Sequence, residues 1–240
     1  MAQEQDQEIT DLEQLVAELR ATVELKDHLL QMVSHEMRTP LVSITNFSTS
    51  IIGSWDVLSD DDKREYVTII NQQATRLSRL VHDLLAVARL EAGRLRTVSE
   101  PVGVCDVANE VIKELATPDG PSVSVRCDDG LVVLADRDHV KQILVNFVSN
   151  AIKYGKEPIE IDGERRGDEI ALWVSDGGEG LSPEYEPHLF EKFSQQRADQ
   201  HATGSGLGMS IVEGLAHAQR GTAWYDRSDA RVRFGVTLPT

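Results

Sequence analysis

The sequence is poor in cysteine and in basic residues, and it contains no long apolar run. Its two cysteines, Cys105 and Cys127, have no metal-ligand spacing, so we expect buried or free thiols in a reducing cytosol, with no disulfide and no structural zinc. The 24 Lys and Arg residues against 40 Asp and Glu give a net charge of −16, which disfavours direct binding to nucleic acid or anionic lipid. No segment approaches the roughly 20 apolar residues of a membrane span, and the start lacks the basic and apolar regions of a signal peptide. We therefore expect a cytoplasmic chain without a membrane span.

The first 33 residues carry a heptad pattern. Apolar residues recur at alternating spacings of three and four, interrupted by Lys26 alone, at Ile9, Leu12, Val16, Leu19, Val23, Leu30 and Val33. This pattern is the a/d seam of a coiled coil. Residues 1–33 are therefore predicted to be a coiled-coil linker that dimerises the chain.

His35 follows this coiled coil directly. Continuing the heptad frame places His35 at an outward f position, one residue before the carboxylate of Glu36. An exposed histidine beside a carboxylate on a helix is suited to accept a phosphoryl group. A Glu beside a His on a helix is otherwise ordinary surface. Pro40 lies inside the same helical pattern, where we expect a bend.

A second helix is predicted after Gly53. Ser59, followed by three aspartates, has the residue types of an N-cap and an acidic first turn. The three-four spacing then continues at Ile70, Leu77, Leu80, Leu84 and Val87. Residues 34–94 are therefore predicted to form an antiparallel helical hairpin, which becomes a four-helix bundle in a dimer. Residues 95–104, with Pro101 and Gly103, are predicted to be a hinge.

The remaining residues, 105–240, change periodicity. Short alternating or β-branched runs predict strands at 122–126, 131–134, 159–161, 170–174, 222–225 and 231–238. Helical spacing falls between them, at 104–115, 138–154 and 209–219. The pattern predicts an α/β sandwich with helices on one face of the sheet, so the whole chain is of the α+β class.

Asp176 and the glycines after it form one candidate ligand site. Asp176 follows a predicted strand and precedes Gly177, Gly178 and Gly180, where the backbone can turn sharply and approach a ligand. A carboxylate there could accept a hydrogen bond from an exocyclic amine of a ligand. Taken alone, a glycine-rich turn after a strand is more often only a turn.

A polar helix face forms the second candidate site. Asn146 and Asn150 are one helical turn apart, and Lys153 and Tyr154 follow. An amide oxygen could join phosphate oxygens and water around Mg²⁺, which prefers such oxygen ligands. Two asparagines on a helix are otherwise usually solvated surface.

The third candidate site is the glycine-rich segment before the last helix. Gly204, Gly206 and Gly208, with Leu207 between the last two, precede an apolar helix whose N-terminal N–H groups could bind an anion. The polar segment between residues 181 and 203 precedes them. It contains Lys192, which could meet phosphate charge; Arg197 is better explained as an exposed residue.

These motifs, in this order, resemble those of bacterial sensor histidine kinases. The resemblance rests on Ser34–Leu41, Asn146–Asn150, Asp176–Gly180, Phe190–Phe193 and Gly204–Gly208. It implies a dimerisation and histidine-phosphotransfer hairpin followed by a GHKL-type ATP-binding domain. It further implies that Asp176 binds the adenine amine, that Asn150 holds Mg²⁺, and that Asn146, Lys153 and Tyr154 lie near the nucleotide.

The implied function is that of a two-component histidine kinase core. His35 would be phosphorylated from Mg²⁺-ATP with Glu36 accepting a proton, and the phosphoryl group would pass to an aspartate of a response regulator receiver domain. Thr39 matches a position that helps dephosphorylate the partner, so phosphatase activity is also implied. A sensor module would act in cis or in trans. Two alternatives remain at this stage: a GHKL-superfamily ATP-binding conformational switch, and a signalling scaffold without phosphotransfer.

Overall fold

The computed structural model describes residues 16, 31, 33–116, 120–128, 130–196, 205–228 and 231–240. The chain divides into two compact units, Met1–His82 and Asp83–Thr240. Almost all of the predicted coiled coil, and also Arg197 and Gly204, lie outside the described residues. In the part of the chain that is described, no helix is both long enough and apolar enough to cross a membrane.

The first unit is a helical hairpin, as predicted. Residues 33–53 are helical without a break at Pro40, and α2 spans Asp60–Glu91. Ser59 caps α2, because its hydroxyl oxygen accepts from the N–H of Asp62 at 3.1 Å while the Asp62 carboxylate accepts from the N–H of Ser59 at 3.2 Å. This reciprocal pair satisfies two N–H groups at the point where the sequence predicted the helix to start.

Apolar and aromatic side chains join the two helices of the hairpin. Ile51 and Leu80 are buried, and the rings of Phe47 and Tyr66 are 5.1 Å apart and tilted by 60°. The heptad frame that places His35 at an f position places Ile51 at an a position, on the face predicted to lie inward. The heptad frame therefore predicted correctly which helix face lies inward.

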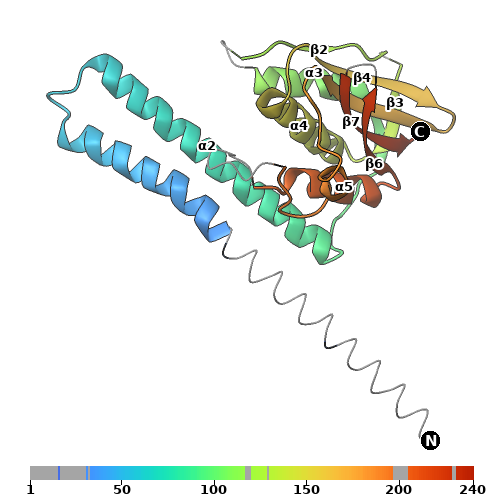
Figure 1. Cartoon of the computed structure of the whole chain (residues 1–240), viewed down its shortest axis with the longest axis horizontal. Coiled ribbons are helices and arrows are strands. Elements are labelled where there is room, and N and C mark those ends of the chain that lie inside the picture. The colour runs from blue at the N-terminus through green and yellow to red at the C-terminus, as the bar shows by residue number, and fades with distance from the viewer. Residues whose placement is uncertain are drawn as a thin grey trace, which may run out of the picture. The chain divides into compact units, whose positions relative to one another are not determined.

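The second unit is an α/β sandwich. Its elements in chain order are β1 Glu100–Gly103, α3 Val104–Leu115, β2 Val123–Val125, β3 Val132–Ala135, α4 Arg137–Tyr154, β4 Ile159–Arg166, β5 Glu169–Asp176, the 3₁₀ turn Glu186–His188, α5 Gly208–Ala218, β6 Thr222–Ser228 and β7 Arg231–Pro239. Five strands form a sheet in the order β2-β4-β5-β7-β6, in which only β2 and β4 pair in parallel. Strands β1 and β3 form a separate antiparallel pair. The helices α3 and α4 lie on the same side of the large sheet (Figure 1).

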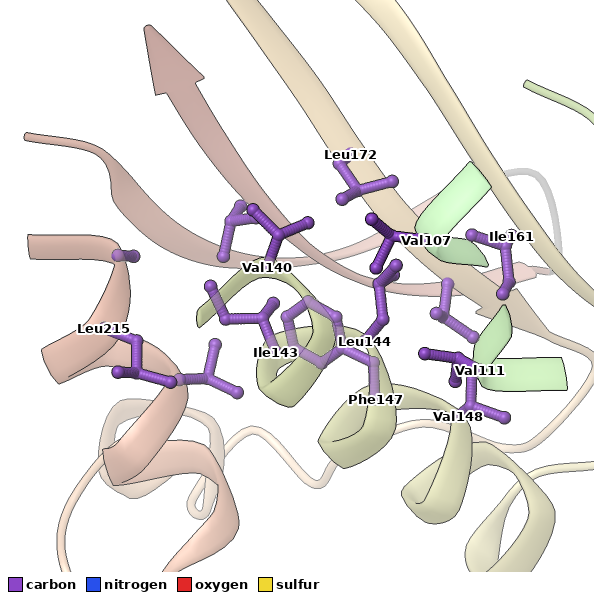
Figure 2. Close-up of a cluster of buried hydrophobic side chains, with 14 of the residues drawn as sticks. Val107, Val111, Val140, Ile143, Leu144, Phe147, Val148, Ile161, Leu172 and Leu215 are labelled. Atoms are coloured by element: carbon purple, nitrogen blue, oxygen red, sulfur yellow. The ribbon is translucent and has the colours of Figure 1, made fainter. Parts of the chain in front are cut away.

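The core of this unit lies between the helices and the large sheet. Figure 2 shows Val107 and Val111 of α3, several residues of α4, Leu215 of α5 and Leu172 of β5 gathered in one cluster. The α4 residues are Val140, Ile143, Leu144, Phe147 and Val148, whose three-four spacing places them on one helix face. Complete burial of each such side chain contributes about 1.5–3 kcal/mol, so α4 is held firmly against the sheet.

Four residues of the predicted hinge form a strand instead. Residues 100–103 are β1, which pairs with β3 so that Val102 lies opposite Val133. Both valines are buried, and this burial favours the pairing. Pro101 misled the prediction, because proline is tolerated in a strand that has only one neighbour. Within the predicted hinge, only residues 95–99 belong to neither a helix nor a strand.

The two cysteines form a disulfide, and the prediction of free thiols is wrong. Cys105 lies in the first turn of α3 and Cys127 follows β2, at a sequence separation of 22 positions and with 6.0 Å between their Cα atoms. That separation lies within the range that a disulfide bridges. The sequence spacing gave no sign that the fold brings the start of α3 beside the end of β2.

Candidate functional site

The candidate phosphoryl acceptor lies on the first helix of the hairpin. His35 is exposed, as its heptad position predicted, and Thr39 is exposed one turn further on. Glu36 is partly buried, and its Oε2 atom accepts a hydrogen bond from Nη2 of Arg76 at 3.1 Å. Arg76 comes from α2, so the second helix of the hairpin fixes the carboxylate beside the histidine.

Asp176 ends strand β5 and is buried, with a relative exposure of 3%. Its Oδ1 atom accepts from the N–H of Gly178 at 2.6 Å, and the N–H of Gly177 donates to the Lys156 carbonyl oxygen at 2.7 Å. The turn after β5 is thereby tied to the segment that follows α4. This arrangement fixes the carboxylate at the end of a buried strand.

Two glycines make room for the Asp176 carboxylate. A Cβ atom on Gly155 would lie 2.6 Å from Cγ of Asp176, and a Cβ atom on Gly178 would lie 2.6 Å from its Oδ1. The glycine after α4 and the glycine after β5 therefore both lie against the same carboxylate. Gly178 was a predicted site residue, whereas Gly155 was not, because its only signal in the sequence is its position just after Tyr154.

Burial raises the pKa of Asp176 above the usual value for an aspartate, because desolvation disfavours the charged form. Hydrogen bonds from Gly178 and from the backbone of Lys156, and the positive charge of Arg231, lower it in part. The Asp176 carboxylate can therefore accept a hydrogen bond from a neutral amine, and no positively charged group needs to contact it directly.

The asparagine face of α4 meets the start of α5. Nδ2 of Asn146 donates to the carbonyl oxygen of Gly208 at 3.2 Å, and Gly208 is the first residue of α5. Asn146 and Asn150 are both partly buried, whereas Lys153 and Tyr154 are exposed, with Nζ of Lys153 4.7 Å from the centre of the Tyr154 ring. The amide side chain of Asn146 is thus beside the N-terminus of α5.

Gly206 holds the chain just before α5 against Phe193. The N–H of Phe193 donates to the Gly206 carbonyl oxygen at 2.9 Å, and a Cβ atom on Gly206 would lie 2.7 Å from Cα of Phe193. Gly206 has a φ of 67°, which favours glycine. Leu207 is fully buried beside it. Phe193 and the residue two positions before α5 therefore meet at a contact that only glycine fits.

Two further contacts fix this segment. Nζ of Lys192 pairs with Oε1 of Glu91, at the end of α2, at 2.7 Å, so its side chain is engaged away from the glycines. The hydroxyl of Tyr225 accepts from the N–H of Leu181 at 2.9 Å, beside Gly180, whose φ is 75°. Tyr225 was not predicted to be a site residue, because the sequence around it indicated only a strand.

Two family models match separate parts of the chain. The His Kinase A (phospho-acceptor) domain matches residues 25–93, and the Histidine kinase-, DNA gyrase B-, and HSP90-like ATPase matches residues 135–240. The first range contains His35, and the second contains the candidate nucleotide residues of α4, β5 and α5. The chain belongs to the sensor histidine kinases.

Curated relatives agree with this assignment. A sensor-like histidine kinase of Rhizobium meliloti is 33% identical over 82% of this chain and 39% of the relative. YkoH of Bacillus subtilis is 31% identical over 80% of this chain and 44% of the relative, and SenX3 of Mycobacterium tuberculosis is 33% identical over 79% and 48%. The chain thus spans less than half the length of these sensor histidine kinases.

Solved structures share the fold. The Acinetobacter baumannii histidine kinase AdeS aligns with a TM-score of 0.63 at 24% identity, covering 85% of this chain and 97% of AdeS. Full-length ShkA, solved in complex with AMPPNP, aligns with a TM-score of 0.62 at 25% identity, covering 89% of this chain and 45% of ShkA. The order of a helical hairpin followed by an α/β ATPase domain is therefore that of known histidine kinases.

Proposed function

We propose that this chain is the kinase core of a two-component system, which phosphorylates His35 from Mg²⁺-ATP and passes the phosphoryl group to an aspartate of a response regulator. One observation carries the proposal. An exposed histidine, in the part of the chain that matches a phospho-acceptor domain, is joined in one chain to a buried aspartate between glycines in the part that matches an ATPase.

Adenine recognition is assigned to Asp176. Its carboxylate would accept from the exocyclic amine of adenine, and guanine has no amine at that position. Gly155 and Gly178 leave the carboxylate uncovered by side chains of their own. The triphosphate would lie toward the N-terminus of α5, where N–H groups and the helix dipole favour an anion. Gly204, Gly206 and Gly208 would let it approach the backbone closely.

Asn150 is the residue assigned to Mg²⁺. Among the described residues there is no group of three or more His, Cys, Asp or Glu side chains placed to hold a metal ion. A partly buried amide fits a magnesium ion that takes most of its ligands from phosphate oxygens and water. When bound, the ion would neutralise charge on the phosphates. Asn146 would orient the nucleotide beside α5, and Lys153 would contribute positive charge near the phosphates.

His35 is assigned the chemical step. One ring nitrogen attacks the γ-phosphorus of ATP in line, forming an N–P bond while the bond to the β–γ bridging oxygen breaks and ADP leaves. The proton on the other ring nitrogen passes to the carboxylate of Glu36, which raises the nucleophilicity of the attacking nitrogen. Arg76 holds that carboxylate from the second helix.

Two partners complete the proposed function. The hairpin exposes large apolar residues outside the contact between its own two helices, at Leu41, Val42, Val67 and Val81, which a second copy would cover in a four-helix bundle. The response regulator would dock beside His35, and Thr39, one turn further on, would help to orient the water that dephosphorylates it. A sensor module would supply the input in cis or in trans.

Labelling with γ-³²P-ATP and Mg²⁺ tests the phosphorylation. The wild-type chain is expected to acquire label that is stable in base and lost in acid, as a phosphoramidate is. His35→Gln should abolish it, and His82→Gln, which changes an exposed histidine on α2, should not. Labelling of His35→Gln at the wild-type level would refute the assignment. The labelled chain, mixed with a panel of receiver domains, would then identify the regulator.

A further inference from the structure

Arg231, at the start of β7, ties three strands together close to Asp176. Its Nη2 nitrogen donates to Oγ of Ser175 on β5 at 2.8 Å, and the same nitrogen donates to the carboxylate of Glu160 on β4. Glu160 and Ser175 are directly paired in register across β4 and β5. The guanidinium therefore bridges β4, β5 and β7 at the residue immediately before Asp176.

This contact lies on the face of the sheet opposite the helices. Side chains alternate along a strand, and Val174 belongs to the core under the helices, so Ser175 points to the other face and Asp176 points back to the helix side. Arg231 shares the face of Ser175, because Arg233, two residues further along β7, is paired with Ser175. Arg231 thus holds β5 from behind the site.

The charges around this contact are unequal. Glu160 is 9% exposed, and it is also paired with Nη2 of Arg126, which follows β2, at 2.5 Å. Two guanidinium groups thus share one carboxylate, which leaves one positive charge in excess. The buried carboxylate of Asp176, on the neighbouring residue of β5, has the opposite sign. An ionised Asp176 makes the group of four charges neutral.

We propose that Arg231 is a positioning residue for the nucleotide, which fixes the end of β5 so that Asp176 presents its carboxylate to the adenine amine. The inference rests on the proposed function, because it assigns Asp176 to adenine. Arg231 acts through Ser175 and through its charge, without touching the nucleotide. Its charge opposes the effect of burial on the pKa of Asp176. A carboxylate that stays ionised accepts a stronger hydrogen bond than its neutral form.

The test compares Arg231→Gln, Arg231→Lys and Arg233→Gln in the full chain. ATP and GTP affinities are measured by calorimetry, autophosphorylation is measured at saturating ATP, and thermal unfolding reports folding. Arg233 is the matched control, because it lies on the same face of the same strand with its guanidinium 5.7 Å from the centre of the Trp173 ring.

Arg231→Gln should weaken ATP binding roughly tenfold, because the charged hydrogen bond that fixes Ser175, and with it the neighbouring Asp176, is lost. The weaker binding of GTP should stay unchanged, so that selectivity for adenine falls. Autophosphorylation at saturating ATP should remain close to wild type. Arg231→Lys, which keeps the charge and several N–H donors, should restore most of the affinity. Arg233→Gln should bind ATP as the wild type does.

Several results would overturn the inference. The inference is wrong if an Arg231→Gln chain folds and binds ATP as tightly as the wild type. It is also wrong if Arg233→Gln loses as much ATP affinity as Arg231→Gln. If Arg231→Gln does not fold, Ser175→Ala removes the link to β5 alone and should still weaken ATP binding; unchanged affinity would refute the positioning role. A wild-type chain that binds no ATP would overturn the proposed function as well, which separates the two failures.

Discussion

Replacing Asp176 by asparagine is the sharpest test of the nucleotide site. The substitution keeps the size of the side chain, and it keeps an oxygen that can accept from the N–H of Gly178. In the wild-type chain the nitrogen of Gly178 lies 2.6 Å from Oδ1 of Asp176. It removes the negative charge and places an NH₂ group where the adenine amine needs an acceptor. Hydrogen bonds to charged groups contribute about 1.5–3 kcal/mol, so ATP affinity should fall by a factor of roughly 10 to 100.

The assay is calorimetric titration of the Asp176→Asn chain with ATP and with GTP. ATP binding should weaken by that factor, while GTP binding should change little, because guanine has no amine at the position of the adenine amine. Asp162→Asn is the matched control, since Oδ1 of Asp162 accepts a backbone N–H from Gly163 at 2.7 Å on β4. An Asp176→Asn chain that folds and keeps its preference for ATP would refute the assignment of adenine to this carboxylate.

Three further predictions address the pH dependence, the glycine before α5 and the helix cap. Because burial raises the pKa of Asp176 above its unfolded value, ATP affinity should fall on acidification at a higher pH than for an ordinary aspartate. The contribution of Asp176 to folding stability should instead be lost as the pH rises. ATP titrations and thermal unfolding at several pH values measure these two trends, and Asp176→Asn should abolish both. Gly206→Ala should lower the free energy of unfolding by about 1–3 kcal/mol and weaken ATP binding, because it combines a positive φ with a backbone clash. Gly167→Ala, where φ is 68° and no atom lies within 4 Å, should lower the free energy of unfolding by less. Equal losses for the two variants in denaturant unfolding would contradict a role for the contact between Gly206 and Phe193. Ser59→Ala should destabilise the hairpin by about 0.5–2 kcal/mol in thermal unfolding, because it removes the helix cap. Ser78→Ala, in the middle of α2, should not destabilise the hairpin. Unchanged stability in Ser59→Ala would show that the cap contributes nothing.

The hairpin and most of the sandwich could be predicted from the sequence because local patterns determine them. The three-four spacing of apolar residues located α2, and the residues around Ser59 marked its start. The range predicted for α3, 104–115, is the observed one, because Gly103 and Ala116 flank a clean apolar stripe. Period-two alternation located six of the strands. These features depend on residues a few positions apart.

Features that depend on distant residues were missed. Strand β1 exists only because β3, about 30 residues later, offers a partner for it, and the four residues from Glu100 have no strand pattern of their own. The disulfide between Cys105 and Cys127 also depends on how α3 and β2 meet. Separate elements likewise bring Gly155 beside Asp176 and Arg231 behind it. No spacing rule along one segment could have found these contacts.

Phosphorylation of the exposed His35 imidazole by ATP bound to the α/β domain can be observed in the purified chain itself. The chain is incubated with Mg²⁺-ATP, and the modified residue is mapped by mass spectrometry under basic conditions. We expect a phosphoramidate on His35 that forms only with ATP and disappears in acid. A chain that binds ATP but carries phosphate on another residue, or none at all, would contradict it.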